Sequence, residues 1–133
     1  MITELRDGIA TNLGTIPGLR TKAFVPDTFS APMAVVEPLT INFDTTMGRG
    51  LDEFNFKVTV LVSRVSDRVS QASLDAYCSS SGDSSVKSAI ESDRTLGGKA
   101  NDLRVTGITT YGGLTIGDTT YLAAEFAVKV YAN

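Results

Sequence analysis

The chain lacks histidine and tryptophan altogether, and its 133 residues include a single cysteine, Cys78. Without histidine it has neither the commonest general base nor the commonest transition-metal ligand of proteins. One cysteine cannot form an internal disulfide, which suits a protein kept in a reducing compartment. We therefore predict a protein that is not an enzyme, with no catalytic residue, no metal and no other cofactor.

Basic clusters and long apolar runs are also missing. The chain has 12 Lys and Arg residues against 15 Asp and Glu, for a net charge of −3, and no two basic residues are adjacent. Nucleic-acid binding needs clustered basic side chains, so we expect no specific binding of DNA. No run approaches the roughly 20 apolar residues of a membrane span, and the N-terminal residues do not resemble a signal peptide. We expect a protein made in the cytoplasm, without a membrane partner.

Three helices and five strands are predicted from the spacing of apolar residues. Five apolar residues recur every three or four positions over residues 2–16, which predicts a first helix over residues 2–13, and Thr3 suits its N-cap. Ser66 or Asp67 is expected to cap the second helix, which runs to about Ser79. The stripe of the first helix is Ile2, Leu5, Ile9, Leu13 and Ile16; the row expected to be buried in the second is Val69, Ala72 and Ala76, widened by Leu74, Tyr77 and Cys78.

The strands are indicated by alternation of apolar and polar residues, which is clearest over residues 53–64. In the strand at 34–44, Pro38 cannot donate a ladder hydrogen bond, so we place it at an edge or a bulge. A slip in the apolar phase of the fourth strand predicts a bulge at Gly107. The strands are expected at residues 19–24, 34–44, 53–64, 103–111 and 119–132, with 112–118 as the connection between the last two.

The resulting order is α-β-β-β-α-α-β-β. Because strands come in runs rather than alternating with helices, the pattern predicts an α+β fold: a mostly antiparallel sheet with the N-terminal helix and a helix pair packed on one face. Neither a repeat nor a linker divides the chain, so we predict one domain over residues 1–133.

The segment "LDAYCSSSGDSSVKSAIESD", residues 74–93, contains the residues most suggestive of chemistry. Cys78 is expected near the C-terminal end of a helix, where the helix dipole raises a thiol pKa, so we interpret it as structural. Ser84 and Lys87 formally match a Ser-x-x-Lys motif. Ser84 is more simply read as the N-cap of a short third helix that buries Val86, Ala89 and Ile90.

Two segments have the character of contact surfaces. The first is an apolar, proline-containing arm, Phe24–Met33, and the second is a glycine-containing hairpin tip, Thr45–Leu51. Arms, tips and open sheet edges are common means by which small subunits join their neighbours. The alternative for the arm is that Phe29 folds back onto its own core. The candidate subunit-interface residues are Phe24, Val25, Phe29 and Met33, and the candidate residues for contacts along an assembly axis are Thr45, Met47 and Arg49.

Four segments together resemble one family: "ITELRDGIATNL", "LDAYCSSSGDSSVKSAIESDRTLGG", "DLRVTGITTYG" and "YLAAEFAVKVYA". The family is the tail terminator, or tail completion, proteins of long-tailed siphophages, particularly those infecting actinobacteria. The likeness covers nearly the whole chain and lies in the style of sequence and the order of elements. The family carries no catalytic or metal motif to compare.

The resemblance implies a structural subunit that forms a six-membered ring at the head-proximal end of the phage tail. Such a ring ends polymerisation of the tail tube and joins the tail to the neck. The implied partners are copies of the chain, the major tail tube protein and a neck or head-completion protein. DNA would pass through the lumen without specific binding, and the protein would be made in the host cytoplasm before it enters the virion.

Other functions stay open at this point. The nearest is another head–tail connector, such as a stopper or head-closure protein, which would use the same ring logic with a different neighbour. A small hydrolase that uses Ser84 and Lys87 belongs to a different class, as does a hydrolase with paired carboxylates. The last is a small-molecule binding module with a pocket between the sheet and the helices.

Overall fold

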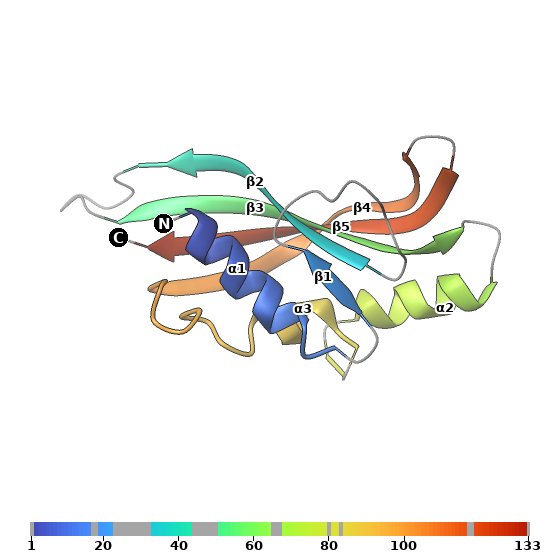
Figure 1. Ribbon diagram of the computed structural model, residues 1–133, viewed down its shortest axis with the longest axis horizontal. Coiled ribbons are helices and arrows are strands. Elements are labelled where there is room, and N and C mark those ends of the chain that lie inside the picture. Colours follow the sequence, from blue (N-terminus) through green and yellow to red (C-terminus); the bar gives the residue numbers. More distant parts are fainter. Residues whose placement is uncertain are drawn as a thin grey trace.

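The fold is taken from a computed structural model, which describes residues 2–16, 19–22, 33–43, 51–64, 68–79, 81–82, 84–116 and 119–132. The predicted α+β class and the order α-β-β-β-α-α-β-β are confirmed (Figure 1). The elements are α1 (Ile2–Leu13), β1 (Arg20–Lys22), β2 (Met33–Asn42), β3 (Asp52–Arg64), α2 (Arg68–Tyr77), α3 (Val86–Ile90), β4 (Asp102–Ile116) and β5 (Thr119–Ala132).

The five strands form one sheet in the order β1-β2-β3-β5-β4. Short β1 pairs with β2 in parallel, whereas the three other pairings are antiparallel, which confirms a mostly antiparallel sheet. The two longest pairings join β3 to β5 and β5 to β4. Strands β4 and β5 form the hairpin drawn in orange and red in Figure 1. Within the described part of the chain, β1 and β4 are the two edges of the sheet.

The core lies between one face of this sheet and the three helices. Helix α1 lies against β2, α2 against β3 and β5, and α3 against β4. The alternation predicted for residues 53–64 is confirmed, because every second side chain of β3 enters this core. The buried residues of this row are Phe54, Phe56, Val58, Val60 and Val62, and the stripe of α1 meets them through Leu5, Ile9 and Leu13.

The opposite face of the sheet carries a row of paired charges. The Lys57 ammonium lies 3.3 Å from the Glu37 carboxylate and 3.2 Å from that of Glu125. Partial burial alone would lower the pKa of Lys57, but the hydrogen bonds and charges of Glu125 and Glu37 together raise it above its ordinary value. Lys129 pairs with Glu53 at 3.3 Å in the same way. Opposite charges on neighbouring strands therefore stabilise this face locally.

The predicted bulges are present in the sheet. The register between β2 and β3 shifts between Pro38 and Thr40, which places the proline at a bulge as expected. In β4 the register shifts between Val105 and Gly107, and a second shift between Ile108 and Thr110 was not predicted. Two shifts within a few residues explain why the apolar phase of this strand was hard to follow in the sequence.

The buried row of α2 differs from the prediction. Ala72 and Ala76 are exposed, while Leu74 and Tyr77 are buried and Cys78, just after the helix, is half-buried. Both rows have helical spacing, and the row with leucine and tyrosine removes more apolar surface from water than a row of alanines. Size therefore selected the face that packs on the sheet.

The prediction that residues 112–118 form a connection was also wrong for most of that segment. β4 continues to Ile116 and pairs in register with β5, from Gly112 opposite Ala123 to Ile116 opposite Thr119. Two glycines in sequence indicate a turn, but a long partner strand supplies the hydrogen bonds that hold them extended.

The helix caps also required correction. α1 begins at Ile2, so Thr3 lies inside the helix rather than at its N-cap. The N-cap of α3 is Ser85 and not Ser84, because the Ser85 hydroxyl accepts the Ser88 N–H at 3.1 Å. The proposed caps of α2, Ser66 and Asp67, lie outside the described residues.

The connection between α3 and β4 is fastened to α1. The buried side-chain amide of Asn12 donates to the carbonyl oxygens of Ile90 and Asp93, at 2.9 and 3.1 Å. A methyl group at Gly8 would lie 3.0 Å from Cβ of Leu96, so α1 and the connection approach closely there. Gly97 and Gly98 turn the chain within this connection with positive φ angles, 70° and 93°, which glycine adopts readily. These contacts fix the connection before it reaches the edge strand β4.

Candidate interaction surface

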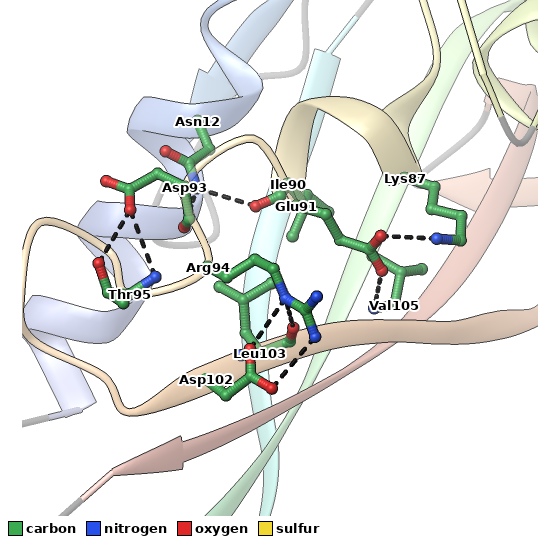
Figure 2. A network of polar contacts seen from close by, with 10 residues as sticks. All are labelled: Asn12, Lys87, Ile90, Glu91, Asp93, Arg94, Thr95, Asp102, Leu103 and Val105. Atoms are coloured by element: carbon green, nitrogen blue, oxygen red, sulfur yellow. Dashed lines mark hydrogen bonds and ion pairs between the residues drawn. The ribbon is translucent and has the colours of Figure 1, made fainter.

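The first part of the edge strand β4 is closed by an acidic side chain from the end of α3. Glu91 Oε2 accepts the backbone N–H of Val105 at 2.9 Å, and its Oε1 lies 2.6 Å from the Lys87 ammonium (Figure 2). Partial burial alone would raise the pKa of Glu91. The hydrogen bonds from Lys87 and Val105, with the charges of Lys87 and Arg94, outweigh it and lower the pKa below its ordinary value. Glu91 thus occupies a backbone donor that an added strand would need.

An arginine completes the closure two residues earlier, at Leu103. Arg94 Nε donates to the Leu103 carbonyl at 3.3 Å, and the guanidinium forms two bonds to the Asp102 carboxylate, at 2.9 and 3.1 Å. The Leu103 N–H is also bonded, to Oδ1 of Asp102 at 2.9 Å. Figure 2 shows both side chains of the connection, Glu91 and Arg94, turned toward β4. We call Leu103–Val105 the closed part of the edge.

The rest of the strand has a different character. Residues 106–116, "TGITTYGGLTI", contain no charged side chain. Among the residues that the structure describes, no strand pairs with the outer edge of β4 here. Ile108 and Tyr111 are 41% and 46% exposed, and the Tyr111 hydroxyl donates to Asp75 on α2 at 2.5 Å. We call residues 106–116 the open part of the edge.

A small apolar cavity opens between the two parts. Its volume is about 190 Å³, and of its described lining residues Lys87 is the charged one. A side chain built on Gly107 would meet no atom within 4 Å, so the backbone is accessible there. The lining consists of Cys78, Ser79, Lys87, Val105, Gly107, Ile108 and Phe126.

Cys78 borders this cavity as an unreactive thiol. Burial, and then the charge of Asp75, raise the pKa of Cys78 to about 11. A thiol that stays protonated at neutral pH is a poor nucleophile. The direction of the pKa shift agrees with the interpretation from the sequence, although its causes are burial and the charge of Asp75 and not the helix dipole.

The contacts around Ser84 and Lys87, the pair that matches Ser-x-x-Lys, hold the end of α2, α3 and β4 together. Lys87 lies in the first turn of α3 and its ammonium is bonded to Glu91, while the cap function belongs to the neighbouring Ser85, whose hydroxyl also donates to the Ser79 carbonyl at 2.6 Å. These contacts give Lys87 a role in holding α3 and β4 together, and nothing in them favours a hydrolase.

Another exposed apolar residue lies toward the opposite edge of the sheet, at the end of β2. Phe43, directly after β2, is 70% exposed, the highest value among the large apolar side chains described. The preceding Asn42 donates to the Glu53 carboxylate at 2.7 Å. This bond, with others from Lys129 and Asn55, lowers the pKa of Glu53 despite the opposing effect of burial.

Most of the predicted contact residues lie outside the described part of the chain, namely Phe24, Val25, Phe29, Thr45, Met47 and Arg49. Met33 is described: it begins β2, pairs with Leu61 of β3 and is 3% exposed. Its side chain is therefore already buried within one subunit.

The sequence reasoning missed Phe43, Ile108 and Tyr111 as surface residues. Phe43 follows Leu39 and Ile41 at a spacing of two, which predicts one shared strand face, whereas β2 ends at Asn42, before Phe43. The signal available for β4 was its uncharged run of residues, in a chain where 20% of residues are charged.

Within the described residues there is no group of three or more Cys, Asp or Glu that could hold a metal ion. Nor is any helix of that part long and apolar enough to cross a membrane. No protein-family model matches the chain, and a comparison with curated proteins finds no significant match.

Proposed function

We propose that the chain is a structural subunit of a phage tail that assembles into a ring at the head-proximal end of the tail tube. The proposal starts from the resemblance to siphophage tail terminators. Its partners would be other copies of the chain, most simply six in a ring, the tail tube protein and a neck or head-completion protein. Its location would be the virion tail.

The observation that carries the proposal is that two unlike surfaces lie toward opposite edges of one sheet. On the β4 side lie the open part of the edge, the exposed Ile108 and Tyr111, and the cavity. On the β2 side lies the exposed Phe43. A ring built head to tail needs two different patches on each subunit, because each contact joins one kind of patch to the other.

The axial contacts are proposed to come from the tip predicted earlier, Thr45, Met47 and Arg49, which follows Phe43 in the sequence. The outer face of the sheet is unsuited to gripping DNA, since its lysines are neutralised by carboxylates: Lys57 by Glu37 and Glu125. A ring subunit with paired rather than free lysines would let DNA slide past.

The test uses purified protein and the tail tube protein of the same phage. We expect tubes polymerised with the protein to be short and capped at one end, and tails made without this gene product to be overlong, as measured by electron microscopy. Tubes of unchanged length, with no protein bound to them, would refute the terminator role. If the protein instead bound only isolated neck components, the connector alternative would replace it.

A further inference from the structure

We propose that the contact between neighbouring subunits is made by Phe43 of one copy, seated in the β4 cavity of the next. This inference rests on the proposed function, because it specifies how a head-to-tail ring would close. Phe43 is the knob, and the cavity lined by Cys78, Val105, Ile108 and Phe126, with Lys87 as its charged member, is the pocket.

The first argument is size. A phenyl ring is the group to be placed, and cavities of roughly 150 Å³ lined by apolar side chains admit benzene. The cavity here measures about 190 Å³. Its lining is apolar apart from Lys87 and Ser79, so filling it with an aromatic ring buries apolar surface on both sides of the contact.

The second argument is position. Strands β3 and β5 lie between β2 and β4, so three strand spacings of about 4.8 Å separate the two strands by about 14 Å. Phe43 follows the end of β2, whereas the cavity opens beside Val105 and Ile108 of β4. The knob and the pocket are thus on opposite sides of the sheet and suit two copies of the chain rather than one.

The third argument is charge. The Glu53 carboxylate accepts a hydrogen bond from Asn42, the residue before the knob, and this bond is the largest cause of its lowered pKa. The charged member of the pocket is the Lys87 ammonium, whose side chain is 42% exposed. Lys87 is already paired with Glu91, and Glu53 with Lys129, so seating Phe43 would bring together two locally neutralised ion pairs and charge does not oppose the contact.

The contact also explains why the edge of β4 is divided. Glu91 and Arg94 close the edge at Leu103–Val105, which prevents a foreign strand from adding across the pocket mouth. A side chain can still enter, because the accessible backbone at Gly107 leaves room. The pocket is therefore suited to a projecting side chain more than to an added strand.

Covalent capture tests the geometry directly, since Cys78 is the native cysteine of the pocket. In the Phe43→Cys variant, the introduced thiol of one copy should meet Cys78 of the next. With a copper–phenanthroline oxidant in alkaline buffer, which offsets the raised pKa of Cys78, denaturing gels should show a ladder of covalent oligomers. The double variant Phe43→Cys, Cys78→Ser should give no ladder longer than a dimer, and wild-type protein should give none. A ring that forms normally but yields no ladder in the first variant would overturn the inference and leave the ring proposal intact.

Substitution of the knob, Phe43, or of the pocket residue Ile108 should weaken assembly without unfolding the subunit, because both side chains are exposed. We expect Phe43→Ser and Ile108→Asp each to raise the concentration for half-assembly about tenfold or more, as is usual for a central aromatic contact. Phe43→Leu keeps an apolar knob and should assemble nearly as well as wild type. The measurement is light scattering coupled to size-exclusion chromatography, with circular dichroism to confirm the fold.

A mixture of the two variants tests direction. The Phe43→Ser protein keeps an intact pocket and the Ile108→Asp protein keeps an intact knob, so together they should form a dimer that grows no further. Assembly of Phe43→Ser alone to wild-type size would show that the contact lies elsewhere. A wild-type protein that stays monomeric at every concentration, and also on tail tubes, would refute both this contact and the ring.

Discussion

The closed and open parts of β4 belong to one strand and pair with one partner, yet they differ in what meets their outer edge. At Leu103–Val105, side chains from the α3–β4 connection bond to the backbone. Over residues 106–116 the strand is uncharged and carries exposed apolar side chains. The difference shows that, among the described residues, charged side chains bond to the outer edge of β4 only beside the α3–β4 connection, which supplies Glu91 and Arg94. Beyond that point a partner is the natural means of covering it.

The same comparison applies to burial. Leu103, in the closed part, is 1% exposed and joins the core, whereas Ile108, in the open part, is 41% exposed. A side chain that the fold itself covers contributes to the stability of one subunit. A side chain left exposed contributes less to that stability, and in the proposed ring contact it would contribute to association.

The largest expected effect is the difference in unfolding free energy between substitutions at Leu103 and at Ile108. Leu103→Ala should lower the free energy of unfolding by about 2–5 kcal/mol, because it leaves a cavity in a packed core. Ile108→Ala should lower it by less, about 1 kcal/mol, since Ile108 is already 41% exposed to solvent. Urea unfolding of both variants, at a concentration where the wild type is monomeric, measures the difference. Equal losses would mean that the open part is also covered within the subunit.

The next effect concerns the carboxylate that closes the edge. Glu91→Ala removes the partner of the Val105 N–H and of Lys87, and should cost about 1–3 kcal/mol of unfolding free energy. Glu91→Gln keeps an acceptor for the N–H and loses only the charge, so it should cost about 1 kcal/mol or less, as expected for a partly exposed ion pair. Should the two variants be equally stable, the backbone bond contributes nothing and the closure is electrostatic alone.

The pH dependence of the same group has a definite sign. The pKa of Glu91 is lower in the folded protein than in the unfolded chain, so its contribution to stability is complete above the unfolded value. That contribution is lost as the pH falls through the folded value. Urea midpoints measured from neutral pH into the acid range should fall less steeply for Glu91→Gln than for wild type. Glu53 and Asp93 also have lowered pKa values, so part of the acid sensitivity should remain in the variant.

The smallest expected effect is on unfolding free energy, and it tests how tightly the α3–β4 connection packs against α1. Gly8→Ala adds a methyl group 3.0 Å from Cβ of Leu96, where the two segments cannot easily move apart. Overpacking costs about 1–3 kcal/mol, and the better helix propensity of alanine returns about 1 kcal/mol. We expect a net loss of about 1 kcal/mol in thermal or urea unfolding. Gly82→Ala, in an open position, is a control for added bulk, although its φ of 113° adds strain. A gain in stability for Gly8→Ala would show that the connection adjusts freely.

The candidate site was less predictable than the fold because its parts depend on where elements end. Phe43 continues the apolar phase of the preceding strand, and only the end of β2 at Asn42 leaves it exposed. The cavity joins the residues that directly follow α2 to residues of α3, β4 and β5, and no sequence pattern links Cys78 to Phe126. The role of Glu91 depends on an α3 C-terminus that lies beside β4, a contact between segments 14 residues apart.

The sequence by itself determined the periodic elements. The stripe of α1, the alternation of β3 and β5 and the α+β class follow from local spacing, because period 3.6 and period 2 place apolar residues on one face whatever lies opposite. Tertiary structure alone decided which of two possible rows α2 buries, and whether "GGLTI" bends or extends. It also decided which part of β4 is closed. Each of these depends on a partner element distant in the chain, whose packing area and hydrogen bonds outweigh the local preference.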